Sequence, residues 1–119
     1  MTRHALIIED EILIAYEVQE VLERLGFDSF DLAASPREAL AYATSHRPSL
    51  ITADVRIEGG TGLDAVRAIT AAMGDIPVVY VTANADMLRR EQVEAVVEKP
   101  IAWSALAAAC NKVCGLVAT

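Results

Sequence analysis

Basic residues are scarce in this sequence, with ten lysines and arginines against seventeen aspartates and glutamates and a formal net charge of −7. Direct nucleic-acid binding requires a basic face, so this balance argues against it and favours an acidic site for a cation. Long apolar runs are also missing, since none approaches the roughly 20 residues of a membrane span. The first four residues lead directly into a strand-like segment and do not resemble a signal peptide. We therefore expect a cytoplasmic protein that does not enter the membrane.

Cysteine is equally rare, and the two present, Cys110 and Cys114, are four residues apart. On a helix they would share one face but lie too far apart for an easy disulfide. Zinc would need further ligands close to them, and the surrounding sequence offers none. We interpret both cysteines as small buried apolar side chains.

The 119 residues suffice for one compact domain, and a hydrophobic fraction of 54% allows a sizeable core. There is no linker, internal repeat or low-complexity segment. We therefore expect a single domain over residues 1–119.

Strand-like and helix-like segments alternate along the whole chain. The apolar runs predict strands over residues 4–9, 27–34, 50–54, 76–82 and 93–99. Helical periodicity predicts helices over 10–25, 36–46, 63–73 and 103–117, while the polar segment 83–91 predicts only a shortened fourth helix or a loop. Such alternation indicates an α/β fold with a mostly parallel sheet. We expect a flavodoxin-like, doubly wound, five-stranded sheet of order 2-1-3-4-5.

Polar residues stand where four of these strands end: Glu9 and Asp10, Asp54, Thr82, and Lys99. In a parallel sheet all four ends lie at the same edge. Three adjacent carboxylates repel one another unless a cation attends them, and oxygen ligands select Mg²⁺, with Mn²⁺ as the alternative. A hydroxyl and an ammonium group beside them suit a transferring phosphoryl group. Asp54 is the natural nucleophile, because aspartate can form an acyl phosphate.

With Gly62, Ala83 and Pro100 at the expected offsets, this set resembles the receiver domain of bacterial two-component response regulators over essentially the whole chain. The resemblance implies a stand-alone phosphoacceptor domain, a signalling switch and not an enzyme beyond its own phosphotransfer and autodephosphorylation. It also implies a cis Lys99–Pro100 peptide bond.

The resemblance assigns a role to each site residue. A sensor histidine kinase or a histidine phosphotransfer protein would phosphorylate Asp54, and Thr82 and Lys99 would bind the phosphoryl oxygens. The Mg²⁺ ligands would be Glu9, Asp10, Asp54 and the backbone carbonyl of Arg56. The phosphorylated domain would then change its binding to a downstream protein that the sequence does not identify.

Three features depart from the usual receiver pattern. Glu58 replaces a frequent proline, so the following glycine loop should be more mobile, and Val96 replaces a frequent aromatic switch residue. The segment between Thr82 and Lys99 is short, as in receivers of alphaproteobacterial stress signalling, which it resembles more weakly. We also consider a pairing of Arg56 with Glu9 or Glu58 in the absence of phosphate.

Other functions remain open. The departures leave room for a receiver-like module that is never phosphorylated and acts by contact alone. An aspartyl-phosphate phosphatase would carry a second aspartate where Arg56 stands, and a flavin-binding protein would carry a phosphate-binding loop where the acidic residues follow the first strand. The last helix and the short fourth segment also offer a surface for a homodimer. His4 and His46 are expected to lie away from the site, and we assign them no role.

Overall fold

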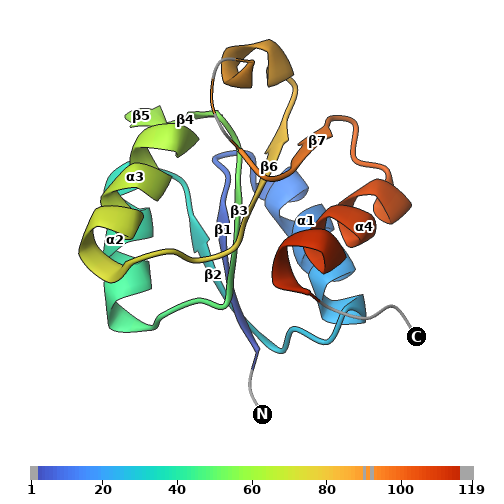
Figure 1. Ribbon diagram of the computed structural model, residues 1–119, viewed down its shortest axis with the longest axis horizontal. Coiled ribbons are helices and arrows are strands. Elements are labelled where there is room, and N and C mark those ends of the chain that lie inside the picture. The colour runs from blue at the N-terminus through green and yellow to red at the C-terminus, as the bar shows by residue number, and fades with distance from the viewer. Residues whose placement is uncertain (1–2, 90, 92, 116–119) are drawn as a thin grey trace.

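The computed structural model describes residues 3–89, 91 and 93–115 and contains a five-stranded parallel sheet between two layers of helices (Figure 1). The strands, in spatial order, are β2 (Ser29–Ala33), β1 (His4–Ile8), β3 (Leu50–Ala53), β6 (Val78–Thr82) and β7 (Val96–Glu98). This is the predicted doubly wound order, because β6 and β7 are the fourth and fifth strands expected from the sequence.

The two faces of the sheet bury alternate side chains of each strand. Ile7 faces the layer formed by α1 (Ile12–Arg24) and α4 (Trp103–Cys114). Leu6 faces the layer formed by α2 (Pro36–Ser45) and α3 (Gly62–Met73). Figure 1 shows these pairs of helices on opposite sides of the sheet. Burial on both faces explains why β1 and β3 are mostly apolar, with His4 and Thr52 as their polar residues.

Local capping explains where α2 and α3 begin. The Ser35 hydroxyl accepts a hydrogen bond from the Glu38 N–H at 3.2 Å, and the Glu38 carboxylate accepts one from the Ala34 N–H. Ser35 is therefore the N-cap of α2, and Glu38 satisfies the N–H of the residue before it, much as in a capping box. Thr61 caps α3 in the same way, through the Asp64 N–H at 3.1 Å.

The glycine-rich segment after β3 differs from the prediction of a loop. It forms a two-stranded antiparallel hairpin of β4 (Arg56–Ile57) and β5 (Gly60–Thr61). Gly59, with a φ of +77°, supplies the left-handed residue that the turn requires. The Glu58 N–H donates to the Ala34 carbonyl at 3.2 Å and ties the hairpin to the start of α2.

The shortened fourth helix is confirmed as the single 3₁₀ turn η1 (Ala85–Leu88) between β6 and β7. Other element boundaries shift by up to three residues from the prediction. α4 ends at Cys114, and Val117 lies outside the described residues. Cys110 is buried, whereas Cys114 is only partly buried, contrary to the interpretation of both as buried residues. Within the described part of the chain, no helix is long and apolar enough to cross a membrane.

Candidate functional site

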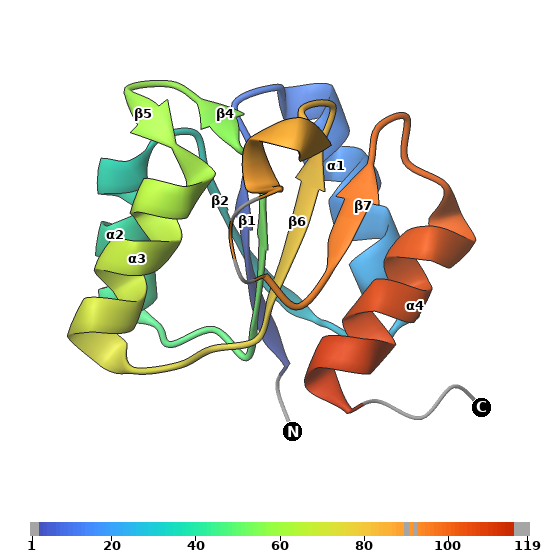
Figure 2. The same cartoon turned by 45° about the horizontal axis from the view of Figure 1, so that its top comes forward.

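The carboxyl ends of the strands meet beside the β4–β5 hairpin and η1 (Figure 2). Two backbone hydrogen bonds continue the sheet past the strand ends, from the Asp54 N–H to the Ile8 carbonyl at 2.9 Å and from the Glu9 N–H to the Ala33 carbonyl at 2.8 Å. They place Asp54 and Glu9 side by side. One carboxylate oxygen from each of Glu9, Asp10 and Asp54 lies within 4.8 Å of the others. The predicted acidic cluster therefore forms, with Asp10 at its exposed edge.

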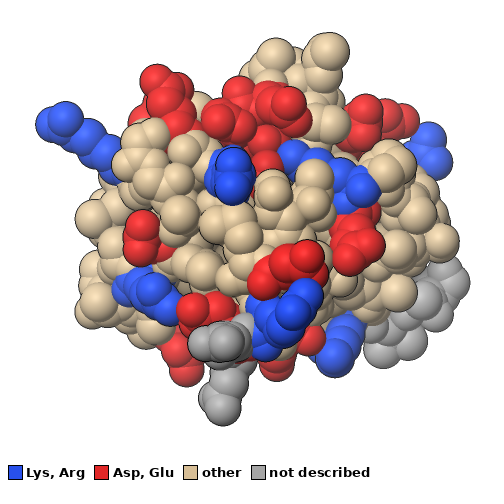
Figure 3. Space-filling view, turned by 90° about the horizontal axis from the view of Figure 1, so that it is seen from above, with Lys and Arg blue, Asp and Glu red and all other residues tan. Residues whose placement is uncertain are grey.

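Lys99 reaches into this cluster from the segment after β7. Its Nζ lies 2.6 Å from Oε1 of Glu9, 2.8 Å from Oδ2 of Asp54 and 3.6 Å from Oε2 of Glu11. The side chains of Glu9, Asp54 and Lys99 are 3%, 9% and 12% exposed, so these pairs are poorly screened by water. Figure 3, which looks onto this end of the sheet, shows acidic side chains gathered next to basic ones.

One ammonium group contacts two buried carboxylates, and this arrangement changes the pKa values of Glu9 and Lys99. Burial raises the pKa of Glu9 to about 7, although hydrogen bonds from Lys99 and from the Glu11 N–H act in the opposite direction. Burial also acts to lower the pKa of Lys99, but its hydrogen bonds to Asp54 and Glu9 outweigh this and raise it above the usual value. Lys99 is therefore held charged, while Glu9 takes up a proton more readily than an ordinary glutamate does.

Asp54 has one satisfied and one unsatisfied oxygen. Oδ2 accepts the hydrogen bond from Lys99, whereas Oδ1 is buried and has no hydrogen-bond partner among the described residues. A buried carboxylate oxygen without a partner is costly. Together with two neighbouring acids, this orphaned oxygen fits a site for a hard divalent cation, which prefers oxygen ligands.

Thr82 ends β6 as a fully buried residue, and its hydroxyl oxygen accepts a hydrogen bond from the Asn84 N–H at 2.9 Å. Thr82 is also tied to Lys99, whose N–H donates to the Thr82 carbonyl at 3.1 Å. The Lys99–Pro100 peptide bond is cis, as expected. The two strand ends predicted to meet Asp54 therefore lie next to each other.

Gly62, at the start of α3, allows the chain to pass close behind Asp54. A Cβ atom at this position would lie 1.9 Å from the Asp54 carbonyl oxygen. The Gly62 N–H donates to the Val55 carbonyl at 2.8 Å and fixes the approach. A residue with a side chain would have to push the backbone of Asp54 away.

Arg56 lies in β4 with an exposed side chain. Among the ion pairs of the described residues, none involves Arg56, and Glu9 pairs with Lys99 instead. The suggested pairing of Arg56 with Glu9 or Glu58 is therefore wrong. Its backbone carbonyl as a metal ligand stays a prediction.

Glu11 is the contact that sequence reasoning missed. Its carboxylate lies 3.6 Å from Lys99 Nζ, and its N–H donates to Glu9 Oε2 at 3.2 Å. The run of three acidic residues after β1 is visible in the sequence. An acid at the start of a helix is usually explained by its favourable interaction with the helix dipole, so the run did not single out Glu11 as a partner of Lys99.

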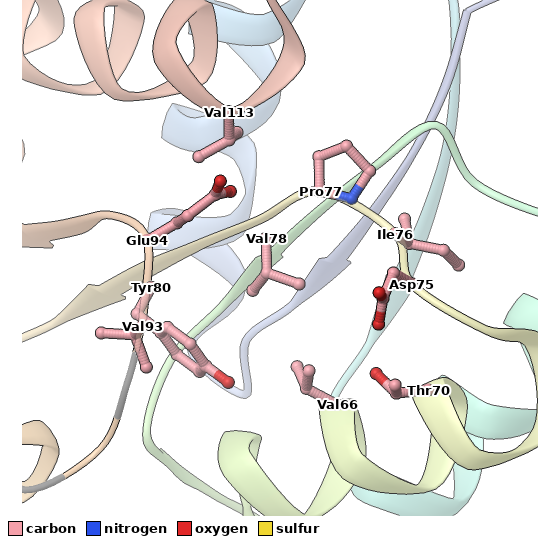
Figure 4. Close-up of a pocket in the computed structure, with 10 residues that line it drawn as sticks. All are labelled: Val66, Thr70, Asp75, Ile76, Pro77, Val78, Tyr80, Val93, Glu94 and Val113. Carbon is pink, nitrogen blue, oxygen red and sulfur yellow. The ribbon is translucent and has the colours of Figure 1, made fainter.

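A groove of about 450 Å³ lies between α3 and the end of α4, beside the first residues of β6. Figure 4 shows Val66 and Thr70 of α3 on one side, Glu94 and Val113 on the other, and Tyr80 of β6 nearby. Burial raises the pKa of Tyr80 to about 12. Valine and isoleucine side chains make the lining partly apolar, and the groove lies along the strand that ends at Thr82.

Comparison with known proteins gives consistent matches. The sequence matches the family described as the response regulator receiver domain over residues 5–111. It is 40% identical over 85 residues to the phyllosphere-induced regulator PhyR of Methylorubrum extorquens, covering 70% of this chain and 32% of PhyR. It is 31% identical over 108 residues to the polar-differentiation response regulator DivK of Brucella ovis, covering 85% of this chain and 87% of DivK.

The fold is similar to the solution structure of the PhyR receiver domain of Erythrobacter litoralis, with a TM-score of 0.89 and 28% identity. That similarity covers 99% of this chain and 94% of the solved one. The chain spans about a third of the length of the Methylorubrum PhyR but most of DivK.

Proposed function

The chain belongs to the response regulator receiver domain family of two-component systems, and we propose that Asp54 is its phosphoacceptor. The observation that carries this proposal is the contact of Asp54 with Lys99 beside two further acids. Lys99 fixes the orientation of the carboxylate through Oδ2, and the buried position keeps competing water away. A held, partly desolvated carboxylate is suited to attack phosphorus.

The phosphoryl donor in this proposal is a phosphohistidine on a sensor histidine kinase or a histidine phosphotransfer protein. The phosphorus–nitrogen bond of the donor breaks as a carboxylate oxygen of Asp54 bonds to phosphorus, and the imidazole leaves after taking up a proton. Lys99 neutralises one of the phosphoryl oxygens, and the Thr82 hydroxyl donates a hydrogen bond to another. The domain takes part in its own phosphorylation and dephosphorylation, as a signalling domain.

The donor set fits Mg²⁺, with Mn²⁺ as the alternative. Glu9, Asp10 and Asp54 would hold the ion, with the carbonyl of Arg56 as a further ligand. Bound there, it would supply positive charge against the carboxylates and the phosphoryl oxygens. Lys99 would then share the carboxylates of Glu9 and Asp54 with the ion. We therefore expect the contacts of the Lys99 ammonium group to change most when the ion binds.

We propose that phosphorylation of Asp54 changes the binding surface of the domain through a movement of β6. Thr82 moves toward the phosphoryl group and pulls the end of β6, and Tyr80 on the same strand lines the groove between α3 and α4. Val96 pairs in register with Tyr80, but it has no ring or hydroxyl group with which to couple to Thr82. We propose that the groove replaces an aromatic switch as the surface that a downstream protein senses.

The proposal also covers the domain organisation and the assembly of the protein. We propose that residues 1–119 act as one cytoplasmic domain and that α4 with the η1 segment can pair two copies. The chain spans about a third of the Methylorubrum PhyR, so the activity of the whole of that protein is not carried over.

The alternative is a receiver-like module that is never phosphorylated. The observation that favours it is the valine at position 96. The intact set of Asp54, Thr82 and Lys99 around one site favours phosphorylation instead.

The test is incubation with Mg²⁺ and acetyl phosphate, followed by intact-mass measurement. We expect a gain of one phosphoryl group that is acid-stable and base-labile and that disappears in Asp54→Asn. The matched control is Asp28→Asn, which replaces an exposed aspartate whose carboxylate accepts a hydrogen bond from the Arg3 N–H, far from the acidic site. If neither acetyl phosphate nor a phosphorylated cognate kinase labels the wild type, the contact-only alternative is correct.

A further inference from the structure

Both histidines of the chain meet at the amino end of the sheet, opposite the acidic site. His4 begins β1 and is 5% exposed, and its ring stacks on that of His46 with centroids 3.7 Å apart and planes 12° apart. Asp31 of β2 completes the group, and ligand atoms of these three residues lie within 4.8 Å of one another. From this arrangement we propose a second metal site, for a transition-metal ion of the Zn²⁺ class.

The strand register brings three of the side chains to one face. His4 pairs with Ser29 and Leu6 pairs with Asp31 in the parallel β1–β2 ladder. Because alternate residues of a strand share a face, His4, Ser29 and Asp31 all project toward the α2 side. The acidic site follows the other end of the five-residue strand β1, roughly 16 Å away at about 3.3 Å per residue. The two sites are therefore independent.

The backbone after α2 is held over His4. Ser49 donates to the His4 carbonyl through both its N–H, at 2.8 Å, and its hydroxyl, at 3.0 Å. The His46 N–H donates to the Tyr42 carbonyl at the end of α2. The backbone of His46 is thus fixed near His4, while its side chain remains exposed.

Both ring nitrogens of His4 have an oxygen close by, so one nitrogen could bind an ion while a hydrogen bond holds the other. Nε2 lies 2.9 Å from Oδ2 of Asp31, and Nδ1 lies 2.8 Å from Oγ of Ser29. A metal-binding imidazole usually donates its other N–H to a nearby oxygen, which fixes the ring. Here the Ser29 hydroxyl would accept from Nδ1–H, and the ion would replace the hydrogen now shared between Nε2 and Asp31.

His46 supplies the third ligand. Stacked parallel rings cannot aim nitrogens at one ion within both ring planes, so the His46 ring must turn. Its exposed side chain is free to do so without disturbing the core. Solvent water would complete a four-coordinate site. Two imidazoles and one carboxylate suit Zn²⁺ and similar ions, whereas Mg²⁺ prefers oxygen ligands alone.

The alternative explanation of these contacts is that His4 is a buried histidine that binds no metal and only forms hydrogen bonds with Ser29 and Asp31. Imidazole NMR distinguishes the two, because a chain with two histidines gives only two sets of ring signals. The experiment uses the full chain without a histidine tag, titrated first with Mg²⁺ and then with Zn²⁺. We expect stoichiometric Zn²⁺ to shift the nitrogen signals of both rings, and Mg²⁺ to leave them in place.

Variants locate the ion. His46→Gln and Asp31→Asn should each weaken Zn²⁺ binding at least tenfold, and Ser29→Ala should weaken it about tenfold through loss of ring support. Asp28→Asn, an exposed acid close to Asp31 in sequence, should bind as wild type does. The surface variant His46→Gln is the primary test, because replacing buried His4 can disturb folding. Amide spectra before addition of the ion confirm that each variant is folded.

The same titration in Asp54→Asn distinguishes Zn²⁺ binding at the histidine cluster from Zn²⁺ binding at the acidic site. We expect the Zn²⁺ shifts of both rings to persist in this variant. If Zn²⁺ leaves both imidazoles unmoved in the wild type, or if the ring shifts vanish in Asp54→Asn, the proposed site is wrong. Equal Zn²⁺ affinity of His46→Gln and wild type would overturn it as well.

Discussion

Lys99 Nζ lies 2.8 Å from Oδ2 of Asp54, and the same ammonium group lies 2.6 Å from Oε1 of Glu9. One buried cation thus balances two buried carboxylates that come from different strands. The two contacts link the folding free energy of the domain to the chemistry of its site, because any change in the charge of one partner alters the other two.

Replacing Lys99 with methionine should therefore destabilise the domain. The substitution leaves Glu9 and Asp54 without their cation, and removal of one partner of a buried ion pair typically costs about 3 kcal/mol or more. Urea unfolding in the presence of a chelator measures the loss. Adding Mg²⁺ should recover part of it. The control is Lys112→Met: among the described residues, the Lys112 Nζ donates only to the Glu94 carbonyl at the surface, so this substitution should change the unfolding free energy by less than about 1 kcal/mol. Equal effects of the two substitutions would contradict the role of Lys99.

The raised pKa of Glu9 predicts a pH dependence of stability. The folded-state pKa of about 7 lies above the ordinary glutamate value of 4.5, so the native state holds the proton more tightly than the unfolded chain does. The resulting contribution to stability is complete below pH 4.5 and is lost as the pH rises to about 7. Glu9→Gln cannot lose a proton, so its unfolding free energy relative to wild type should rise with pH across this window. Chelator-treated protein followed by urea unfolding at several pH values tests this, and parallel curves would refute it.

The arrangement of strands and the main site residues could be predicted from the sequence because parallel strands deliver their last residues to one edge. Glu9, Asp54, Thr82 and Lys99 each follow an apolar run, and that pattern alone brings them together. The contacts made by long side chains could not be predicted in this way. Lys99 pairs with Glu9 and Arg56 does not, because the Lys99 side chain lies among the buried acids with only 12% of it exposed, whereas the Arg56 side chain is exposed.

The cluster of His4, Asp31 and His46 was invisible in the sequence for a related reason. His4 and Asp31 meet through the β1–β2 register, and His46 joins them from the end of α2, far away in the sequence. A one-residue change of register would turn Asp31 to the opposite face of the sheet. Residue patterns predict which face a side chain takes, but the register decides which side chains become neighbours.

Gly62→Ala should destabilise the domain more than a surface glycine substitution does. Its Cβ would lie 1.9 Å from the Asp54 carbonyl oxygen, and relief requires a shift of backbone on both sides. We expect a loss of at least about 3 kcal/mol, at the upper end of overpacking effects. Gly59→Ala is the control, because open space surrounds that position and only its φ of +77° opposes a side chain. Thermal unfolding of both variants measures the difference, and a smaller loss for Gly62→Ala would show that the helix start can yield.

Asp10→Ala should weaken Mg²⁺ binding at least tenfold. Asp10 is the exposed member of the acidic cluster, so its removal should disturb the fold little while taking away one carboxylate ligand. Calorimetric titration with Mg²⁺ gives the affinity, with Asp28→Asn as a control of equal charge change. Unchanged affinity in Asp10→Ala would refute the proposed ligand set.

Thr82→Ala should separate phosphorylation from output. Lys99 and the acidic residues remain in this variant, so Asp54 should still take up a phosphoryl group from acetyl phosphate. The hydroxyl that would draw the end of β6 toward the phosphoryl group is lost, so the groove should no longer respond. Thr82→Ser keeps the hydroxyl and should retain the response.

Amide NMR of beryllofluoride-treated protein measures this at Val93 and Glu94, which line the groove and precede β7. We expect their signals to shift in wild type and Thr82→Ser and to remain in place in Thr82→Ala. Shifts of the same size in Thr82→Ala would mean that the change reaches the groove by another route, for which the backbone hydrogen bond from Lys99 to Thr82 is the nearest connection. In that case the relay would depend on the pairing of β6 with β7 and not on the threonine hydroxyl.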